Sequence, residues 1–291
     1  MPASSARPLV TRPALALLAC ALLTALVWGC RSGSATTAAA PSKGETNQTL
    51  TVFVPCGLII PFSSAIDEFK RLHPELPVKG VYDNHLKLIA QLETGERGDV
   101  FVSPGDAEMG YLDKRNLLER EPRVAVGSYA VVLVVPLANP AGIKSVNDLV
   151  SPKVKAIAFP DPERNSVGYY AKQSLQKLGL WDKVQPKLQV VESAKTSHEL
   201  VQKAQADAAF SFKTCPLPPE PEKVAGMKVQ IVQELPRDSY DTPRVVARIM
   251  RDTPNRKAAE QFLDFLKQPA THDILLKNRL PDNLGLMSKT G

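Results

Sequence analysis

The chain has 291 residues, which is enough for two lobes of ordinary domain size. Hydrophobic residues make up 44% and charged residues 23%, a balance typical of soluble globular proteins, so a polytopic membrane protein and a wholly disordered chain are excluded. The formal net charge of +6 is modest and spread along the chain, so we expect no nucleic-acid partner.

Residues 1–29 have the pattern of a secretory signal peptide. Arg7 and Arg12 precede an uncharged apolar run at 14–28, which is short for a membrane span. The run ends in a small residue followed by Cys30, which resembles the cleavage motif of bacterial lipoproteins. The pattern predicts that Cys30 becomes the lipid-modified first residue and anchors the protein to a membrane. An ordinary cleaved signal peptide is the alternative.

A polar segment follows the predicted anchor. Residues 30–49 are mostly small and polar and have no apolar period, which predicts a lipidated flexible tether. The folded part then begins at residue 50, outside the cytoplasm. We therefore predict a periplasmic or otherwise extracytoplasmic, membrane-anchored lipoprotein.

Strand and helix patterns alternate through the rest of the chain. The first series predicts strands at 50–54, 77–82 and 99–102 and helices at 61–73, 85–94 and 105–116. The second predicts strands at 156–159, 188–191, 208–212, 229–232 and 244–250, with helices at 167–178 and 196–206 and a helical C-terminal part around Phe262. This order predicts an α/β fold whose sheets are mainly parallel and flanked by helices.

A long apolar run at 124–136 divides the two series. It is too long for one simple strand and suits a segment that crosses between two lobes. We therefore predict one lobe from 50–127 and 246–291 and a second from 128–245. Open α/β sheets bind ligands at the carboxyl ends of their strands, so we expect a cleft between the lobes that closes by hinge bending.

Several stretches match a known family in the right order along the chain. They are IDEFKRLHP at 66–74, GDVFVSPGD at 98–106, NPAGIKSVNDL at 139–149, the segment 159–188 and AAEQFLDFLKQP at 258–269. They resemble the molybdate-binding family of bacterial extracytoplasmic solute-binding proteins. The resemblance implies a two-lobed type II periplasmic-binding-protein fold, a monomer that serves an ABC permease in the inner membrane. It implies no enzyme activity and no cofactor.

The resemblance also implies a ligand site. The family holds a tetrahedral oxyanion with hydroxyl groups and backbone N–H groups at helix starts, where the helix dipole favours an anion. The residues of this chain on the corresponding loops are Cys56, Gly57, Asn84, His85, Ser166, Val167, Gly168, Ser211 and Cys215. Gly57 and His85 stand where the family pattern has hydroxyl residues. We therefore expect a small anion of the molybdate or tungstate type, held by an altered ligand set.

The altered residues leave other hypotheses open. Cys56, His85 and Cys215 together form a soft donor set, which suits a soft metal or a metalloid. Alternatively, Cys56 is a small buried residue, or it pairs with Cys215 in a disulfide, which an exported compartment permits. A ligand sensor on the same fold is a further alternative. The usual hydrolase, zinc-protease and nucleotide-binding motifs do not occur, so we predict no enzyme.

Overall fold

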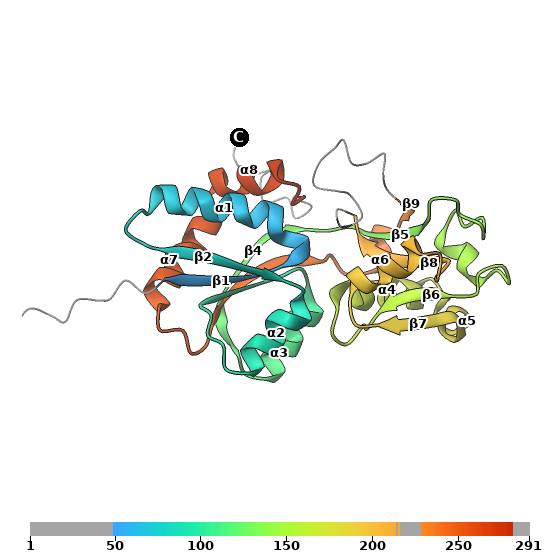
Figure 1. Ribbon diagram of the computed structural model, residues 1–291, viewed down its shortest axis with the longest axis horizontal. Coiled ribbons are helices and arrows are strands. Elements are labelled where there is room, and N and C mark those ends of the chain that lie inside the picture. The colour runs from blue at the N-terminus through green and yellow to red at the C-terminus, as the bar shows by residue number, and fades with distance from the viewer. Residues whose placement is uncertain (1–48, 214, 216–227, 282–291) are drawn as a thin grey trace, which may run out of the picture. The chain divides into compact units, whose positions relative to one another are not determined.

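The computed structural model describes residues 49–213, 215 and 228–281. The predicted signal peptide and nearly all of the tether lie outside these residues. The described strands form two five-stranded sheets within one compact unit (Figure 1). None of the helices in these residues has the length and apolar character needed to span a bilayer.

The first sheet has the strand order β2-β1-β3-β10-β4. Its strands are β1 (Leu50–Pro55), β2 (Val78–Asp83), β3 (Val100–Ser103), β4 (Leu118–Ser128) and β10 (Arg244–Met250). β1 pairs in parallel with β2 and β3, whereas β10 lies antiparallel to both β3 and β4. Four of the five strands therefore point the same way, which confirms the mainly parallel sheet.

The second sheet repeats this arrangement, with the order β7-β6-β8-β5-β9. Its strands are β5 (Val131–Pro136), β6 (Ile157–Pro160), β7 (Leu188–Val191), β8 (Ala208–Phe212) and β9 (Val229–Glu234). β6 pairs in parallel with β7 and β8, and β5 lies antiparallel to β8 and β9. The repeat confirms the two-lobed α/β fold class.

The antiparallel strands are the ones that arrive from the other sheet. β4 ends at Ser128 and β5 begins at Val131, so the apolar run at 124–136 is divided between the two sheets. The chain returns between the end of β9 and the start of β10. Neither β5 nor β10 follows a crossover helix, and such helices are what make consecutive strands parallel.

Helices cover both faces of the first sheet (Figure 1). They are α1 (Ile59–Leu72), α2 (His85–Glu93), α3 (Asp106–Lys114), α7 (Arg256–Leu266) and α8 (Pro269–Lys277). Val52 belongs to the core cluster that contains the buried residues of α1 and α7, whereas Phe53 belongs to the cluster with α2 and α3. Neighbouring strand residues point to opposite faces, so one buried strand contributes to two cores.

The second sheet is covered by α4 (Ser166–Lys177) and α5 (Trp181–Val184) on one face and by α6 (Ala194–Gln202) on the other. Phe159 and Phe210, from neighbouring strands, meet edge to face with their ring centroids 5.6 Å apart. This geometry is the preferred one for an aromatic pair and adds to the core on the α4 side.

Two longer elements, the first part of β4 and α8, were not predicted, and neither was the short helix α5. The first part of β4 reads Leu-Glu-Arg-Glu-Pro-Arg, and its polar side chains hide the strand pattern. α8 starts at Pro269, directly after α7, with proline at a first-turn position where its missing N–H costs nothing. Both elements become visible only through their packing, because α8 lies against α1 and β4 pairs with β10.

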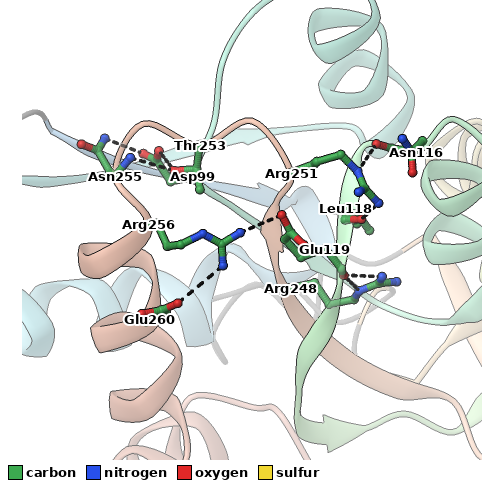
Figure 2. Close-up of polar contacts among 10 residues, drawn as sticks. All are labelled: Asp99, Asn116, Leu118, Glu119, Arg248, Arg251, Thr253, Asn255, Arg256 and Glu260. Atoms are coloured by element: carbon green, nitrogen blue, oxygen red, sulfur yellow. Dashed lines mark hydrogen bonds and ion pairs between the residues drawn. The ribbon is translucent and has the colours of Figure 1, made fainter.

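A buried carboxylate joins three parts of the first half. Asp99 is 3% exposed and accepts hydrogen bonds from Thr51 N at 2.6 Å, Thr253 Oγ1 at 2.5 Å and Asn255 Nδ2 at 3.2 Å. Figure 2 shows Asp99 with Thr253 and Asn255, beside the contact of Arg256 with Glu119. Asp99 thus fixes the start of β1 and the turn before α7 against the start of β3.

We expect Asp99→Ala to lower the free energy of unfolding by about 2–4 kcal/mol, because three donors lose a charged acceptor in a buried place. Urea denaturation measures the change. Asp252→Ala is the matched control, because Asp252 is an exposed acid in the same turn, and we expect a change within about 0.5 kcal/mol. Equal losses in the two variants would contradict the role of Asp99.

Candidate functional site

A small pocket lies where loops from both sheets meet. The first half contributes Pro55, Cys56, Gly57, Asn84, His85, Pro104 and Glu108, with Tyr129 from the crossing, and the second half contributes Asn165, Val167, Ser193, Ala194, Lys195, Phe212 and Cys215. Its volume is about 60 Å³. Pockets for drug-sized organic ligands are roughly 300–1,000 Å³, so this pocket suits a solute of a few heavy atoms.

Three helices begin at the pocket wall. Asn84, Asn165 and Ser193 are the N-cap residues of α2, α4 and α6, and each lines the pocket. Their side chains accept hydrogen bonds from Leu86 N at 2.9 Å, Val167 N at 2.9 Å and Thr196 N at 3.2 Å. The positive ends of three helix dipoles therefore converge on one small space, which favours a negatively charged or electron-rich ligand.

His85 is the first residue of α2 and is 6% exposed. Burial lowers its pKa below the usual value, while the carboxylate of Glu108 acts in the opposite direction. The imidazole is therefore neutral at neutral pH. Its Nε2 atom has no hydrogen-bond partner among the described residues, which is rare for a buried polar atom and marks a position where a ligand can make the missing contact.

Glu108 places a carboxylate in the wall of the same pocket. It lies on α3, is 1% exposed, and accepts hydrogen bonds from Ser166 N at 3.0 Å and from Ser166 Oγ. Next to this contact, Tyr170 donates its hydroxyl to Asp106 at 2.6 Å. α3 and α4 are thereby tied together across the two halves, and the oxygens of Glu108 are already engaged at the start of α4.

The positive charge at the pocket comes from Lys195, the second residue of α6. Its side chain is exposed, and its charge lowers the pKa of Cys56, although burial of that thiol has the larger, opposite effect. An exposed lysine at a helix start adds attraction for an anion without closing the pocket.

The match to known families agrees with this geometry. A family model described as "Bacterial extracellular solute-binding protein" matches residues 50–278, which is most of the chain. The chain belongs to this family. It is therefore a solute-binding protein rather than an enzyme.

Two relatives and one structure illustrate the family. YvgL of Bacillus subtilis, provisionally named an ABC transporter substrate-binding lipoprotein, is 28% identical over 260 residues, 88% of this chain and 94% of YvgL. The molybdate-binding protein ModA of Escherichia coli is 25% identical over 229 residues, 77% of this chain and 86% of ModA. The sulfate-binding protein SubI of Mycobacterium tuberculosis superposes with a TM-score of 0.67 at 13% identity, covering 83% and 89% of the two chains. ModA is named for molybdate binding, and the SubI structure shows the shared fold.

Six of the nine predicted ligand residues line the pocket of this solute-binding protein. They are Cys56, Gly57, Asn84, His85, Val167 and Cys215. They come from four separate loops, so the structure does bring together residues that are far apart in sequence. The strand-to-helix loops come together because the carboxyl ends of the strands meet at one edge of each sheet.

The other three predicted residues are not in the pocket lining. Ser166 is fully buried and its hydroxyl is engaged with Glu108 and with Ala107 N. Ser211 is fully buried and donates to the carbonyl of Phe212 at 3.1 Å. Gly168 packs directly on the end of β6, since a Cβ there would lie 2.0 Å from the carbonyl oxygen of Pro160. These three residues support the pocket from behind.

The hypothesis of a three-residue metal site is not supported by the arrangement. Cys56, His85 and Cys215 line one pocket, but the part of the chain that the structure describes contains no group of three or more His, Cys, Asp or Glu side chains placed to hold a metal ion. The two cysteines are unbridged, and both are exposed as residues. Neither the disulfide nor the plain buried-cysteine interpretation of Cys56 describes this structure.

Sequence reasoning missed much of the pocket wall. Ser193 ends the loop from β7 to α6 and Lys195 lies in the first turn of α6, so the strand-to-helix rule used for the other loops also predicts this position. The strand-to-helix rule does not point to Glu108, because this residue lies inside α3 and not on a loop. Tyr129 reaches the pocket from the crossing segment and donates to the carbonyl of Gly57 at 3.4 Å.

We expect Gly168→Ala to lower the free energy of unfolding by about 1–3 kcal/mol, because the new Cβ must push the start of α4 away from Pro160. Gly110→Ala is the matched control in α3, where a Cβ meets nothing within 4 Å. A helical glycine replaced by alanine in open space gains about 0.5–1 kcal/mol. Urea denaturation compares the two variants, and a neutral Gly168→Ala would contradict the close packing at α4.

Proposed function

We propose that this solute-binding protein captures a small tetrahedral oxyanion of the molybdate or tungstate type and delivers it to an ABC importer. The observation that carries the proposal is the convergence of three capped helix starts on a pocket of about 60 Å³. Relatives named for molybdate binding support the same ligand class.

Backbone donors replace the family's hydroxyl groups in this proposal. An N-cap side chain satisfies only one of the first four N–H groups of a helix, so the remaining donors are available to a ligand. In α2 and α6 the remaining backbone N–H groups belong to the first turns, which begin at His85 and Ala194. The dipoles of the helices and Lys195 supply attraction for the charge. No covalent chemistry is needed.

We further propose that uptake involves hinge closure of two lobes, 50–127 with 246–291 and 128–245. The strands β4 and β5 are separated by a short connection after Ser128, and β9 and β10 by the segment before Arg244. These two connections are where a rotation of one sheet against the other needs the least repacking. The contact between Glu108 and Ser166 would then be made or lost with closure.

We expect molybdate or tungstate to raise the thermal midpoint of the reduced protein by about 5–10 °C at roughly 100 times Kd, because a ligand that binds only the folded state stabilises it. Sulfate and phosphate are measured in the same series, and isothermal titration calorimetry supplies the affinities. Equal ionic strength of sodium chloride is the salt control.

Ala194→Asp tests the helix-start site. The aspartate adds negative charge at the pocket, so oxyanion affinity should fall at least tenfold, while the fold keeps its stability because an acid at a helix start is favourable. Ala270→Asp is the matched control, since Ala270 is exposed in the first turn of α8 and does not line the pocket. Unchanged oxyanion affinity in Ala194→Asp, or no oxyanion binding by the wild type, would sink the proposal.

We also propose that Cys30 carries a lipid anchor. The apolar run before it and the name of YvgL, which includes lipoprotein, support this assignment. In cells, Cys30→Ala should move the protein from the membrane fraction to the soluble extracytoplasmic fraction, because acyl chains supply the attachment. Cys20→Ala is the control and should leave the distribution unchanged. Persistence of Cys30→Ala in the membrane fraction would refute the anchor.

A further inference from the structure

Two thiols from different sheets line the pocket and have no place in oxyanion capture. Cys56 follows β1 in a short 3-10 turn, Cys56–Leu58, and Cys215 follows β8. Both are unbridged. A protonated thiol is a weak hydrogen-bond donor, so it adds little to the binding of a hard oxyanion.

The sulfur of Cys215 lies beside the backbone next to Cys56, and both cysteines line the same pocket. A Cβ built on Gly57, the neighbour of Cys56, would lie 3.4 Å from the sulfur of Cys215. Cys56 also raises the pKa of Cys215, after the larger effect of burial. The fold therefore presents a pair of sulfurs to one small space.

Both thiols keep their protons at neutral pH. Although both residues are exposed to solvent, the protein atoms packed around the thiols disfavour the charged thiolate, which raises the pKa of Cys56 and raises that of Cys215 to about 12. Reactive cysteines that attack electrophiles or form mixed disulfides have lowered pKa values. This pair is instead suited to a partner that itself removes the thiol protons, such as a hydroxide bound to an electrophilic centre.

We propose that Cys56 and Cys215 form a dithiol site for a trivalent metalloid hydroxide, the chemical class that arsenite represents. Two hydroxide groups leave the metalloid, each taking one thiol proton to form water, and two metalloid–sulfur bonds replace the two metalloid–oxygen bonds. The metalloid stays trivalent, so no oxidant or reductant is needed. The proposal rests on the proposed function only in using the same pocket as the entry point for a solute.

The pocket favours a neutral metalloid over a metal cation. Three helix starts point their positive ends at it, which disfavours a cation and leaves an uncharged hydroxide unaffected. A dithiol complex needs two sulfurs, whereas zinc in proteins is held by three or four protein ligands, and the described residues offer no group of three or more His, Cys, Asp or Glu side chains for a metal ion. The volume of about 60 Å³ suits a centre with three small substituents.

The third substituent of the metalloid also finds a partner. After two sulfurs bind, one hydroxyl group remains and needs a hydrogen-bond acceptor. His85 lines the same pocket, is held neutral by burial, and has an unpartnered Nε2. A neutral imidazole accepts a hydrogen bond from a hydroxyl group.

The experiment uses the full chain with Cys20→Ser and Cys30→Ser, so that Cys56 and Cys215 are the only cysteines left of the four. The protein is reduced with a phosphine and desalted, because thiol reductants compete for arsenite. Sodium arsenite is the probe. We expect it to protect both thiols from alkylation and to raise the thermal midpoint, and a small dithiol should reverse both effects.

Single replacements distinguish a dithiol site from two separate contacts. Cys56→Ala and Cys215→Ala should each lower the ratio of arsenite to molybdate affinity about 100-fold or more. In the wild type the second sulfur binds the metalloid intramolecularly once the first has bound, and a single remaining sulfur loses this advantage. The double variant should be no worse than either single one, because the pair acts as a unit. His85→Gln should weaken arsenite binding by a smaller factor, and Ala270→Asp should change neither ligand.

The outcomes separate this inference from the proposed function. Failure of arsenite to protect the thiols, or losses of only a few-fold that add up in the double variant, overturns the dithiol site and leaves oxyanion capture standing. Protection by Zn²⁺ or Cu(I) but not by arsenite overturns the metalloid in favour of a metal. Thiol-dependent arsenite binding without any oxyanion binding upholds the dithiol site and overturns oxyanion capture.

Discussion

The chain crosses between the two sheets twice, entering one at β5 and the other at β10, and the pocket depends on these two crossings. Each of these two strands pairs on both sides with strands of the sheet that it enters, and almost all of its residues are buried. The two sheets are therefore joined by two short connections instead of one. With both connections in place, the loops after β1 and β2 meet those after β6, β7 and β8, so the pocket is built from both halves of the chain.

Two opposing electrostatic features meet in this pocket. The starts of α2, α4 and α6 favour an anion, whereas Glu108 adds a buried carboxylate that is held by Ser166. The remaining polar groups, His85 and the two thiols, are neutral because burial disfavours their charged forms. A pocket of this kind attracts electron-rich oxygen ligands through its backbone and offers soft donors through its side chains. In the two proposals, the oxyanion and the metalloid hydroxide use different parts of the pocket wall.

Much of the fold follows from local sequence pattern. The predicted strands at 50–54 and 208–212 lie within one residue of the observed β1 and β8, because buried strands in such sheets are short apolar runs bounded by turn residues. The polar start of β4 and the helix α8 were missed because each is stabilised by a partner that is distant in sequence. Arg248 donates a hydrogen bond to the carbonyl of Glu119 in β4, and α1 packs on α8.

The sequence by itself determined the alternation of strands and helices, the two similar halves and the loops on which a ligand site must lie, since these depend on local periodicity and on the common direction of the strands. Only the tertiary structure decided which side chains of those loops reach the pocket. Ser166 begins α4 and Ser211 lies near the end of β8, but Ser166 contacts Glu108, and Ser211 contacts Phe212 and Cys215, while Glu108 reaches the pocket from within α3. The direction of a side chain is set by packing against residues far away in the chain, which no local pattern records.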